Sequence, residues 1–321
     1  MGLLHTALEL RKKGILGINR RNRDFILRYN KRHLYPLVDD KLETKRLAVE
    51  HGIPVPPLYG VISTEHDLRK LPDLLSHHSD FALKPAHGAG GDGIIVITGQ
   101  RGGRLRKSNG LWMTVDDLDY HISNILSGVF SLAGQRDNAM LEYRVRFSPL
   151  FEKISFQGVP DVRIIVLLGY PVMAMVRLPT RQSEGRANLH QGAIGAGIDL
   201  ATGRTLGGVW LNERVHEHPD TEESLEGLEI PGWVDFLLLA ARCYEITGLG
   251  YLGVDIVVDR DLGPLLLELN ARPGLNIQIA NDAGLVGRCR RIENEPPRPP
   301  AERVAFSREA FGGTADDQGR H

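Results

Sequence analysis

The sequence predicts an α/β protein, more narrowly an α+β fold of two lobes, and three observations indicate this. Apolar residues make up 42% and charged residues 25% of the 321 positions, as in ordinary globular domains. Runs of β-branched residues bounded by glycine and proline alternate with segments of helical period. With two cysteines and no apolar run of about 18 residues, neither a disulfide framework nor a membrane span is expected. We therefore expect a cytoplasmic protein without membrane contact.

Residues 1–38 are expected to form a short, basic, helical arm. They hold nine Lys or Arg and two acids; nine minus two gives +7, which leaves −8 for the rest of a chain with a net charge of −1. Such an arm can dock on the acidic body of its own chain or on an acidic protein partner. Nucleic acid is a poor fit, because the arm has no aromatic ladder on which bases stack.

The core is expected over residues 39–290, with a first lobe over 39–140 and a second lobe over 141–290. Helical and strand patterns occur in both parts, which is typical of lobes that each combine a sheet with helices. Residues 291–321 begin with a proline-rich stretch and continue in Gly, Asp and Gln. This composition predicts a disordered tail.

Capping side chains mark the helices of the first lobe. Asp40 precedes one helix, because an aspartate side chain accepts hydrogen bonds from the free N–H groups of a first helical turn. Thr114 opens a second helix as part of a capping box with Asp117. The expected elements are a helix over 41–51, strands over 81–84 and 93–98, and a helix from 114 to about 132.

In the second lobe, strands are expected where apolar, β-branched runs are bounded by turn residues. A long helix is expected where apolar residues recur at helical period and end at Gly248. The expected elements are strands over 139–145, 162–168, 172–178, 253–258 and 264–269, and a helix over 233–247.

A glycine-rich loop over 88–93 matches the dinucleotide pattern G-x-G-x-x-G. That pattern needs a helix after the loop, because the pyrophosphate sits on the helix N-terminus. Here Ile94-Ile-Val-Ile97 follows, which favours a strand. Strand, glycine loop and strand instead predict a flap whose backbone N–H groups can close over phosphate oxygens. Lys84 lies on the strand before this flap, in apolar surroundings, and is either an anion ligand or a lysine that reaches solvent.

Acidic and amide side chains interrupt two apolar strands near the C-terminal end of the core. Asp255 interrupts one of them, and Glu268 and Asn270 share one face of the other because side chains alternate along a strand. A hairpin would bring all three together, and three hard oxygen ligands suit Mg²⁺. The alternative is a buried carboxylate paired with Arg163 or Arg272.

Together these motifs resemble the ATP-grasp superfamily, and within it the chain is similar to the RimK-like glutamate ligases. The resemblance covers about residues 36–285 and rests on motifs that occur in the expected order. They are Lys84 with its glycine flap, Met-Leu-Glu142-Tyr143, Gly-Val-Asp255 and Leu-Glu268-Leu-Asn270-Ala-Arg-Pro-Gly. The implied fold is two α+β lobes with the nucleotide between them and a reduced N-terminal domain.

The resemblance also implies roles for single residues. For ATP, Lys45 and Lys84 would contact the phosphates, Gly90 and Gly91 would close over them, and Glu142 and Tyr143 would lie at the adenine. For the metal, Asp255, Glu268 and Asn270 would hold two Mg²⁺ ions, with Mn²⁺ as a substitute. For the γ-phosphate and the acyl substrate, the facing residues would be Arg163, Arg177, Asn188 and Arg272.

The implied activity is an ATP- and Mg²⁺-dependent carboxylate–amine ligase. Such a ligase works through an acyl phosphate, here to join glutamate or a similar amino acid to an amino-acid or peptide acceptor. Two alternatives stay open: an ATP-grasp ligase of another substrate class, and a nucleotide-binding accessory protein. Relatives of this branch carry a folded domain before the core, so it is left open whether a protein partner that docks near the basic arm completes the site. Homo-oligomerisation is left open.

Overall fold

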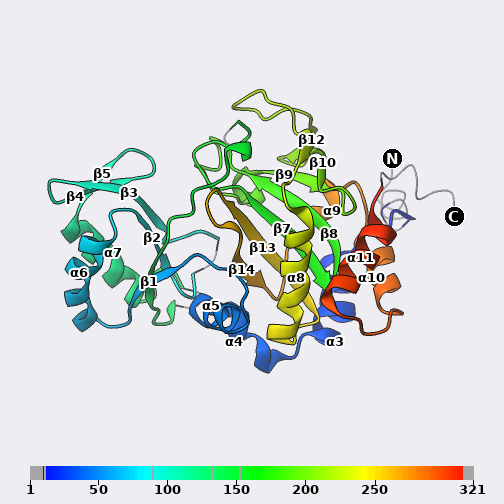
Figure 1. Cartoon of the computed structure of the whole chain (residues 1–321), viewed down its shortest axis with the longest axis horizontal. Coiled ribbons are helices and arrows are strands. Elements are labelled where there is room, and N and C mark those ends of the chain that lie inside the picture. The colour runs from blue at the N-terminus through cyan, green and yellow to red at the C-terminus, as the bar shows by residue number, and fades with distance from the viewer. Residues whose placement is uncertain (1–9, 11, 89, 132–133, 152, 314–321) are drawn as a thin grey trace.

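A computed structural model describes residues 10, 12–88, 90–131, 134–151 and 153–313. Two antiparallel sheets form two lobes that lie side by side (Figure 1). Each lobe has its own cluster of buried apolar side chains, so the chain has two cores rather than one. Within the described ranges, no helix is long and apolar enough to cross a membrane.

The sheet of the first lobe has the order β1-β6-β2-β3-β4-β5. Helices α6 (Leu71–His77) and α7 (Val115–Leu126) pack against it, and its core includes Ile62, Leu83 and Ile122. The 3-10 helix η3 (Glu65–Lys70) leads into α6. The strands are β1 (Leu58–Ile62), β2 (Phe81–Pro85), β3 (Ile95–Arg101), β4 (Arg104–Lys107), β5 (Trp112–Thr114) and β6 (Ala139–Glu142).

The sheet of the second lobe has the order β11-β10-β9-β8-β7-β13-β14, and β12 pairs with β10. Its central strands are buried along almost their whole length, because helices and the N-terminal arm cover them. The strands are β7 (Asp161–Leu167), β8 (Tyr170–Leu178), β9 (Ile194–Ile198), β10 (Arg204–Trp210), β11 (Glu213–Val215), β12 (Glu226–Glu229), β13 (Tyr251–Asp259) and β14 (Gly263–Asn270).

Helices surround the second sheet. Helix α8 crosses it in the foreground of Figure 1, and α10 and α11 lie at the end remote from the first lobe. Short helical segments of the N-terminal part lead to α5, which lies at the junction of the lobes. The bounds are α2 (Ile18–Arg20), η1 (Arg21–Ile26), α3 (Leu27–Tyr29), η2 (Arg32–Leu34), α4 (Pro36–Asp39), α5 (Lys41–Glu50), α8 (Trp233–Thr247), α9 (Ile277–Ala280), α10 (Leu285–Ile292) and α11 (Pro300–Phe311).

The described part of the basic arm packs on the second lobe of its own chain. Phe25 and Ile26 are buried in the larger core. Asn30 donates from Nδ2 to the carbonyl oxygen of Tyr251 at 2.8 Å and accepts from the N–H of Tyr251 at 2.8 Å. Of the alternatives for the arm, the structure therefore shows docking on its own chain. Most of the helix expected at the start of the arm lies outside the described residues.

The tail is a correction to the sequence prediction. Residues 300–311, expected to be disordered, form α11, which packs on β8 and α8. Val304 and Phe311 are buried, and Arg303 forms an ion pair with Glu245. The proline-rich stretch misled the prediction, because proline is also favoured in the first turn of a helix. Residues 314–321 lie outside the described part.

The other boundaries follow capping and glycine chemistry. Asp40 accepts hydrogen bonds from the N–H groups of Leu42 and Glu43, as expected for the cap of α5. Helix α7 ends at Leu126 rather than near Leu132, because Gly128 adopts a φ of 85° and ends the helical path. Strands β9 to β12 were not among the expected elements, because their short runs contain many glycines and turn residues.

Candidate functional site

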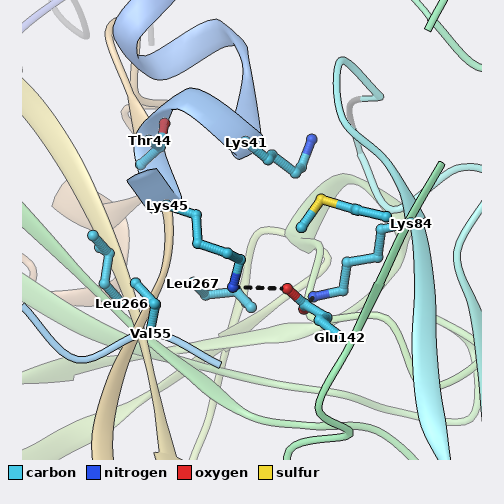
Figure 2. Close-up of a pocket in the computed structure, with 9 residues that line it drawn as sticks. Lys41, Thr44, Lys45, Val55, Lys84, Glu142, Leu266 and Leu267 are labelled. Atoms are coloured by element: carbon cyan, nitrogen blue, oxygen red, sulfur yellow. Dashed lines mark hydrogen bonds and ion pairs between the residues drawn. The ribbon is translucent and has the colours of Figure 1, made fainter. Parts of the chain in front are cut away.

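A cavity lies where α5, the first sheet and β14 meet (Figure 2). Strand β14 reaches this junction because the N–H of Leu266 donates to the carbonyl oxygen of Pro54 at 2.8 Å, just after α5. The two lobes therefore share the walls of one cavity. Its lining residues are Lys41, Thr44, Lys45, Val55, Lys84, Met140, Glu142, Leu266 and Leu267.

A buried carboxylate holds two of the lysines. Glu142, 2% exposed at the end of β6, lies between Lys45 and Lys84, which approach it from opposite sides (Figure 2). Lys45 Nζ is 3.0 Å from Glu142 Oε2, and Lys84 donates to Oε1. Burial would raise the pKa of Glu142, but the two ammonium charges outweigh burial and hold that pKa below its ordinary value. Two cations around one anion leave the group with a net positive charge.

Lys41 is a third lysine of the cavity, and the sequence analysis did not single it out. Its ammonium donates to the carbonyl oxygen of Gly88, and burial lowers its pKa. The signal that would have found it is the capping residue Asp40, which fixes the start of α5. Residues four apart on a helix share a face, so Lys41 must face the same way as Lys45.

The loop between β2 and β3 confirms the expected strand–loop–strand arrangement. Gly90, Gly91 and Gly93 have φ of 69°, 85° and 76°, which only glycine adopts without strain. The loop reaches the second lobe, where Asp92 pairs with Arg186 at 3.4 Å. A Cβ on Gly90 would lie 4.0 Å from the Nδ2 atom of Asn188. The glycine loop therefore spans both lobes and places Asn188 directly beneath it.

The first stem of the glycine loop is fixed by a buried aspartate. Asp137 accepts from the backbone N–H of His87 at 3.0 Å and lies 2.8 Å from His87 Nδ1. Ser131 Oγ donates to the same carboxylate. Burial would raise the pKa of Asp137, but these hydrogen bonds lower it overall. The stem of the glycine loop is thus held in place by one carboxylate.

Four charged side chains form a network on the second sheet. Asp255, 1% exposed, accepts two hydrogen bonds from Arg163 at 2.7 and 2.5 Å and one from Arg177 at 2.9 Å. Arg177 also binds Asp161 with two hydrogen bonds of 2.6 and 2.7 Å. Burial raises the pKa of Asp161 to about 6, while Arg163 and Arg177 hold the pKa of Asp255 below its ordinary value against its own burial.

The three expected metal ligands lie together, but Asp255 is engaged by arginines. Glu268 is directly opposite Asp255 in the β13–β14 register, and Asn270 donates from Nδ2 to Asp255 at 3.2 Å. The pairing of this carboxylate with Arg163 is the alternative raised from the sequence. Arg272 is elsewhere, with its guanidinium 4.7 Å from the ring centre of Tyr35. In the described ranges, no three His, Cys, Asp or Glu residues form a metal-binding group.

Tyr143, expected near the adenine, is held by neighbours. Its backbone N–H donates to the carbonyl oxygen of Pro57 at 2.8 Å, and its hydroxyl donates to Asp259 at 3.3 Å. Burial and the neighbouring carboxylate raise the pKa of the Tyr143 hydroxyl to about 12. Its N–H is therefore not free for a base in this structure, and its role stays a prediction.

Residues 20–294 match the family described as sugar-transfer associated ATP-grasp. The chain belongs to this family. The ATP-grasp fold expected from the sequence is thereby confirmed, and the match extends from the docked arm, through both lobes, to the end of α10. The RimK-like branch is a finer assignment that this match does not include. No curated protein sequence matches this ATP-grasp chain.

Several solved structures are similar to this chain at low identity. The ligase PsnB, complexed with a minimal precursor, is 16% identical over 87% of this chain and 63% of its own, with a TM-score of 0.44. The D-alanine–D-alanine ligase from Bacillus anthracis, complexed with ATP, is 12% identical over 87% and 67%, with a TM-score of 0.44. The D-cycloserine synthetase DcsG is 18% identical over 84% and 71%, with a TM-score of 0.45. The chain thus spans less than two thirds of the PsnB chain.

Proposed function

We propose that this ATP-grasp protein binds Mg·ATP between its lobes and uses it to join a carboxylate to an amine. The observation that carries the proposal is the cavity with Lys41, Lys45 and Lys84 beside a glycine loop that spans both lobes. Three lysines and one buried carboxylate line this cavity and leave an excess of positive charge, which suits the phosphates of a nucleotide. The backbone N–H groups of the glycine loop supply further donors for phosphate oxygens.

The residues present fit a nucleotide and fit a metal in part. Lys41 and Lys84 would hold phosphates, and Lys45 would keep Glu142 in place beside Lys84. Glu268 and Asn270 offer oxygen ligands on one face of β14 for Mg²⁺. The role of Asp255 as a metal ligand stays a prediction, because the guanidinium groups of two arginines occupy its carboxylate. A second metal ion and the use of Mn²⁺ in place of Mg²⁺ also stay predictions.

When bound, Mg·ATP would supply the γ-phosphoryl group that activates a carboxylate as an acyl phosphate. The chain would contribute positioning and charge. Asp161 and Asp255 fix the guanidinium of Arg177, so that its orientation needs no rearrangement when negative charge develops. Arg163 is fixed in the same way by Asp255. Asn188 lies beneath the glycine loop, where its amide can contact the transferred group.

The proposed substrates are an amino acid such as glutamate and an amine acceptor, as the resemblance to RimK-like ligases implies. The description of the matched family favours a second candidate, an ATP-grasp ligase whose acceptor belongs to sugar metabolism. An accessory protein that needs a partner is less well supported, because the described part of the arm is docked on its own lobe.

Binding of Mg·ATP is the first test. A ligand at 100 times its Kd stabilises the native state by about 2.7 kcal/mol, so Mg·ATP should raise the melting temperature of the full chain. Lys84→Met should remove most of this shift, whereas Lys107→Met, on β4 of the same sheet, should keep it. ADP release with candidate amino acids and amines then identifies the substrates. If saturating Mg·ATP does not shift the wild-type protein, the proposal is wrong.

A further inference from the structure

We propose that a second cavity, of about 170 Å³, is the acceptor pocket, and that it takes an uncharged group with both apolar and hydrogen-bonding atoms. This inference rests on the proposed ligase function and names the substrate class that the function leaves open. The cavity lies on the second lobe, between the loop after Asn188, the β10–β11 turn and α9. Its lining includes His190, Val209, Leu211, Asn212, Asn276 and Ile279.

The lining chemistry sets the class of ligand. Among the described residues, no Asp, Glu, Lys or Arg lines the cavity, so a carboxylate or ammonium placed there would lose its hydration without a charged partner. Aliphatic side chains alternate with two amides and an imidazole, a mixture that binds groups such as a primary amide, an acetamido group or a sugar ring. With roughly 30 Å³ for a water in the liquid, 170 Å³ has room for a group of that size.

The β10–β11 turn forms one wall of the cavity and has an unusual backbone conformation. Strands β10 and β11 are joined by two residues, Leu211 and Asn212, with φ of 50° and 70°. Such turns favour Asn or Gly, because a left-handed conformation costs other residues about 1–2 kcal/mol. Leu211 is nevertheless there, 49% exposed and lining the cavity. Stability does not explain an exposed leucine in a left-handed turn, whereas contact with a ligand does.

The opposite wall is rigid. Helix α9 lies so close to β9 that a Cβ on Gly197 would come 2.5 Å from the carbonyl oxygen of Ala280. Asn281 ties the end of the helix to β8 by donating to the carbonyl oxygen of Ala174 at 2.9 Å. Ile279 is 44% exposed on this helix and lines the cavity together with Leu211. The cavity is therefore formed before any ligand arrives.

Asn188 connects the acceptor pocket to the glycine loop. Its Oδ1 atom accepts from the N–H of His190 at 3.0 Å, so that its Nδ2 atom faces Gly90 of the loop. Trp210 donates from Nε1 to the carbonyl oxygen of Gly192 at 2.9 Å. This bond holds the β10–β11 turn against the segment that contains Asn188 and His190. An acceptor in the pocket would therefore lie beside the segment that closes over the phosphates.

The test uses the full chain with Mg·AMPPNP and saturation-transfer NMR on five probes. The probes called uncharged, for the side chain or sugar ring that would enter the pocket, are L-glutamine, L-leucinamide and N-acetyl-D-glucosamine; the charged probes, whose side chains are ionised, are L-glutamate and L-lysine. We expect at least one uncharged probe to bind, and L-glutamine to bind more strongly than L-glutamate. Ile279→Trp, which fills the cavity, should weaken that binding about tenfold, equivalent to about 1.4 kcal/mol. Val234→Trp on α8 is the control and should not weaken it.

Leu211→Gly separates a binding role from a structural one. This change removes the side chain and relieves the left-handed conformation, so it should weaken probe binding without lowering the melting temperature. Every variant must keep the Mg·ATP shift, because that shift reports the proposed function independently. Wild-type protein that binds Mg·ATP but none of the uncharged probes, or equal binding by Ile279→Trp, would overturn the acceptor pocket alone. Loss of the Mg·ATP shift in the wild type would instead overturn the ligase.

Discussion

The two cavities of this protein differ in how they use charge. The cavity proposed for the nucleotide concentrates three lysines and a buried glutamate, whereas the described residues that line the proposed acceptor pocket include no Asp, Glu, Lys or Arg. Buried charges need partners within reach, so the first cavity is tightly cross-linked even without a ligand. The second needs no such partners and is built from a helix face and a turn. The comparison indicates that the nucleotide cavity is the one whose variants disturb the fold as well as binding.

The largest effect is expected from Glu142→Gln. The variant leaves Lys45 and Lys84 buried without their shared anion, and removal of one partner of a buried pair typically costs about 3–5 kcal/mol. Urea unfolding should show this loss near neutral pH. Mg·ATP should recover more stability in the variant than in the wild type, because its phosphates replace the missing carboxylate. Unchanged stability would contradict the role of Glu142 as the organising anion.

The same carboxylate gives the nucleotide cavity a pH dependence in acid. The pKa of Glu142 is lower in the folded state than its ordinary value of 4.5. Its stabilisation is therefore present above the unfolded-state pKa and is lost as the pH falls through the folded-state pKa. Glu142→Gln should lack this acid loss.

Lys41→Met should have the next largest effect, on nucleotide binding. The lysine contributes a buried charge and holds the carbonyl oxygen of Gly88, so its loss removes a phosphate contact and loosens the glycine loop. We expect the Kd for Mg·ATP to rise about 10- to 100-fold, the range for a charged hydrogen bond of about 1.5–3 kcal/mol. Isothermal titration calorimetry measures it, with Lys12→Met as the control for lost charge. Equal Kd values for both variants would remove Lys41 from the site.

Asp161→Asn should change how stability depends on pH. Asp161 has a pKa of about 6 in the folded state and 3.8 as its ordinary value, so the native state binds the proton more tightly. The stabilisation that the protonated Asp161 gives the native state is complete below the unfolded-state pKa and is lost as the pH rises from about 4 to 6. Urea unfolding at pH 4, 5 and 6 should show this fall in the wild type and in the control Asp235→Asn, but not in Asp161→Asn. The same fall in all three proteins would show that Asp161 does not titrate there.

The contrast in charge also explains which residues of the fold and the candidate site could be predicted from the sequence. Charged residues inside apolar strands break the usual burial pattern, which is why Lys84, Asp255 and Glu268 stood out. Asp40 predicted the start of α5 for the same kind of local reason, because capping depends on neighbouring residues alone. Together with the glycine loop and the resemblance to the ATP-grasp superfamily, these signals predicted the two-lobed fold and three residues of the cavity lining, Lys45, Lys84 and Glu142.

Features that depend on distant contacts were not predictable. Arg177 meets Asp255 only after three strands pair, so this contact has no local signal, whereas the pairing of Asp255 with Arg163 was raised from the sequence only as an alternative. Helix α11 is stabilised by burial against β8, which its proline-rich surroundings concealed. The acceptor pocket consists of ordinary apolar and amide residues from three separate segments, and no one of those segments looks unusual by itself.

The smallest effect is expected from Arg186→Ala. Arg186 connects the regions of the two cavities. Its exposed pair with Asp92 ties the glycine loop to the segment that leads to Asn188 and the acceptor pocket. Exposed ion pairs contribute only about 0.2–1 kcal/mol, so the melting temperature should barely change. The loss of about 1 kcal/mol at most corresponds to about fivefold in affinity, so the Kd for Mg·ATP should rise by less than that factor. Because salt screens exposed pairs, the difference from wild type should shrink in 1 M NaCl.

Asp92→Ala should match Arg186→Ala, and the double variant should bind Mg·ATP no more weakly than either single variant. Additive losses would show that the two side chains act separately and that the loop is closed by other contacts.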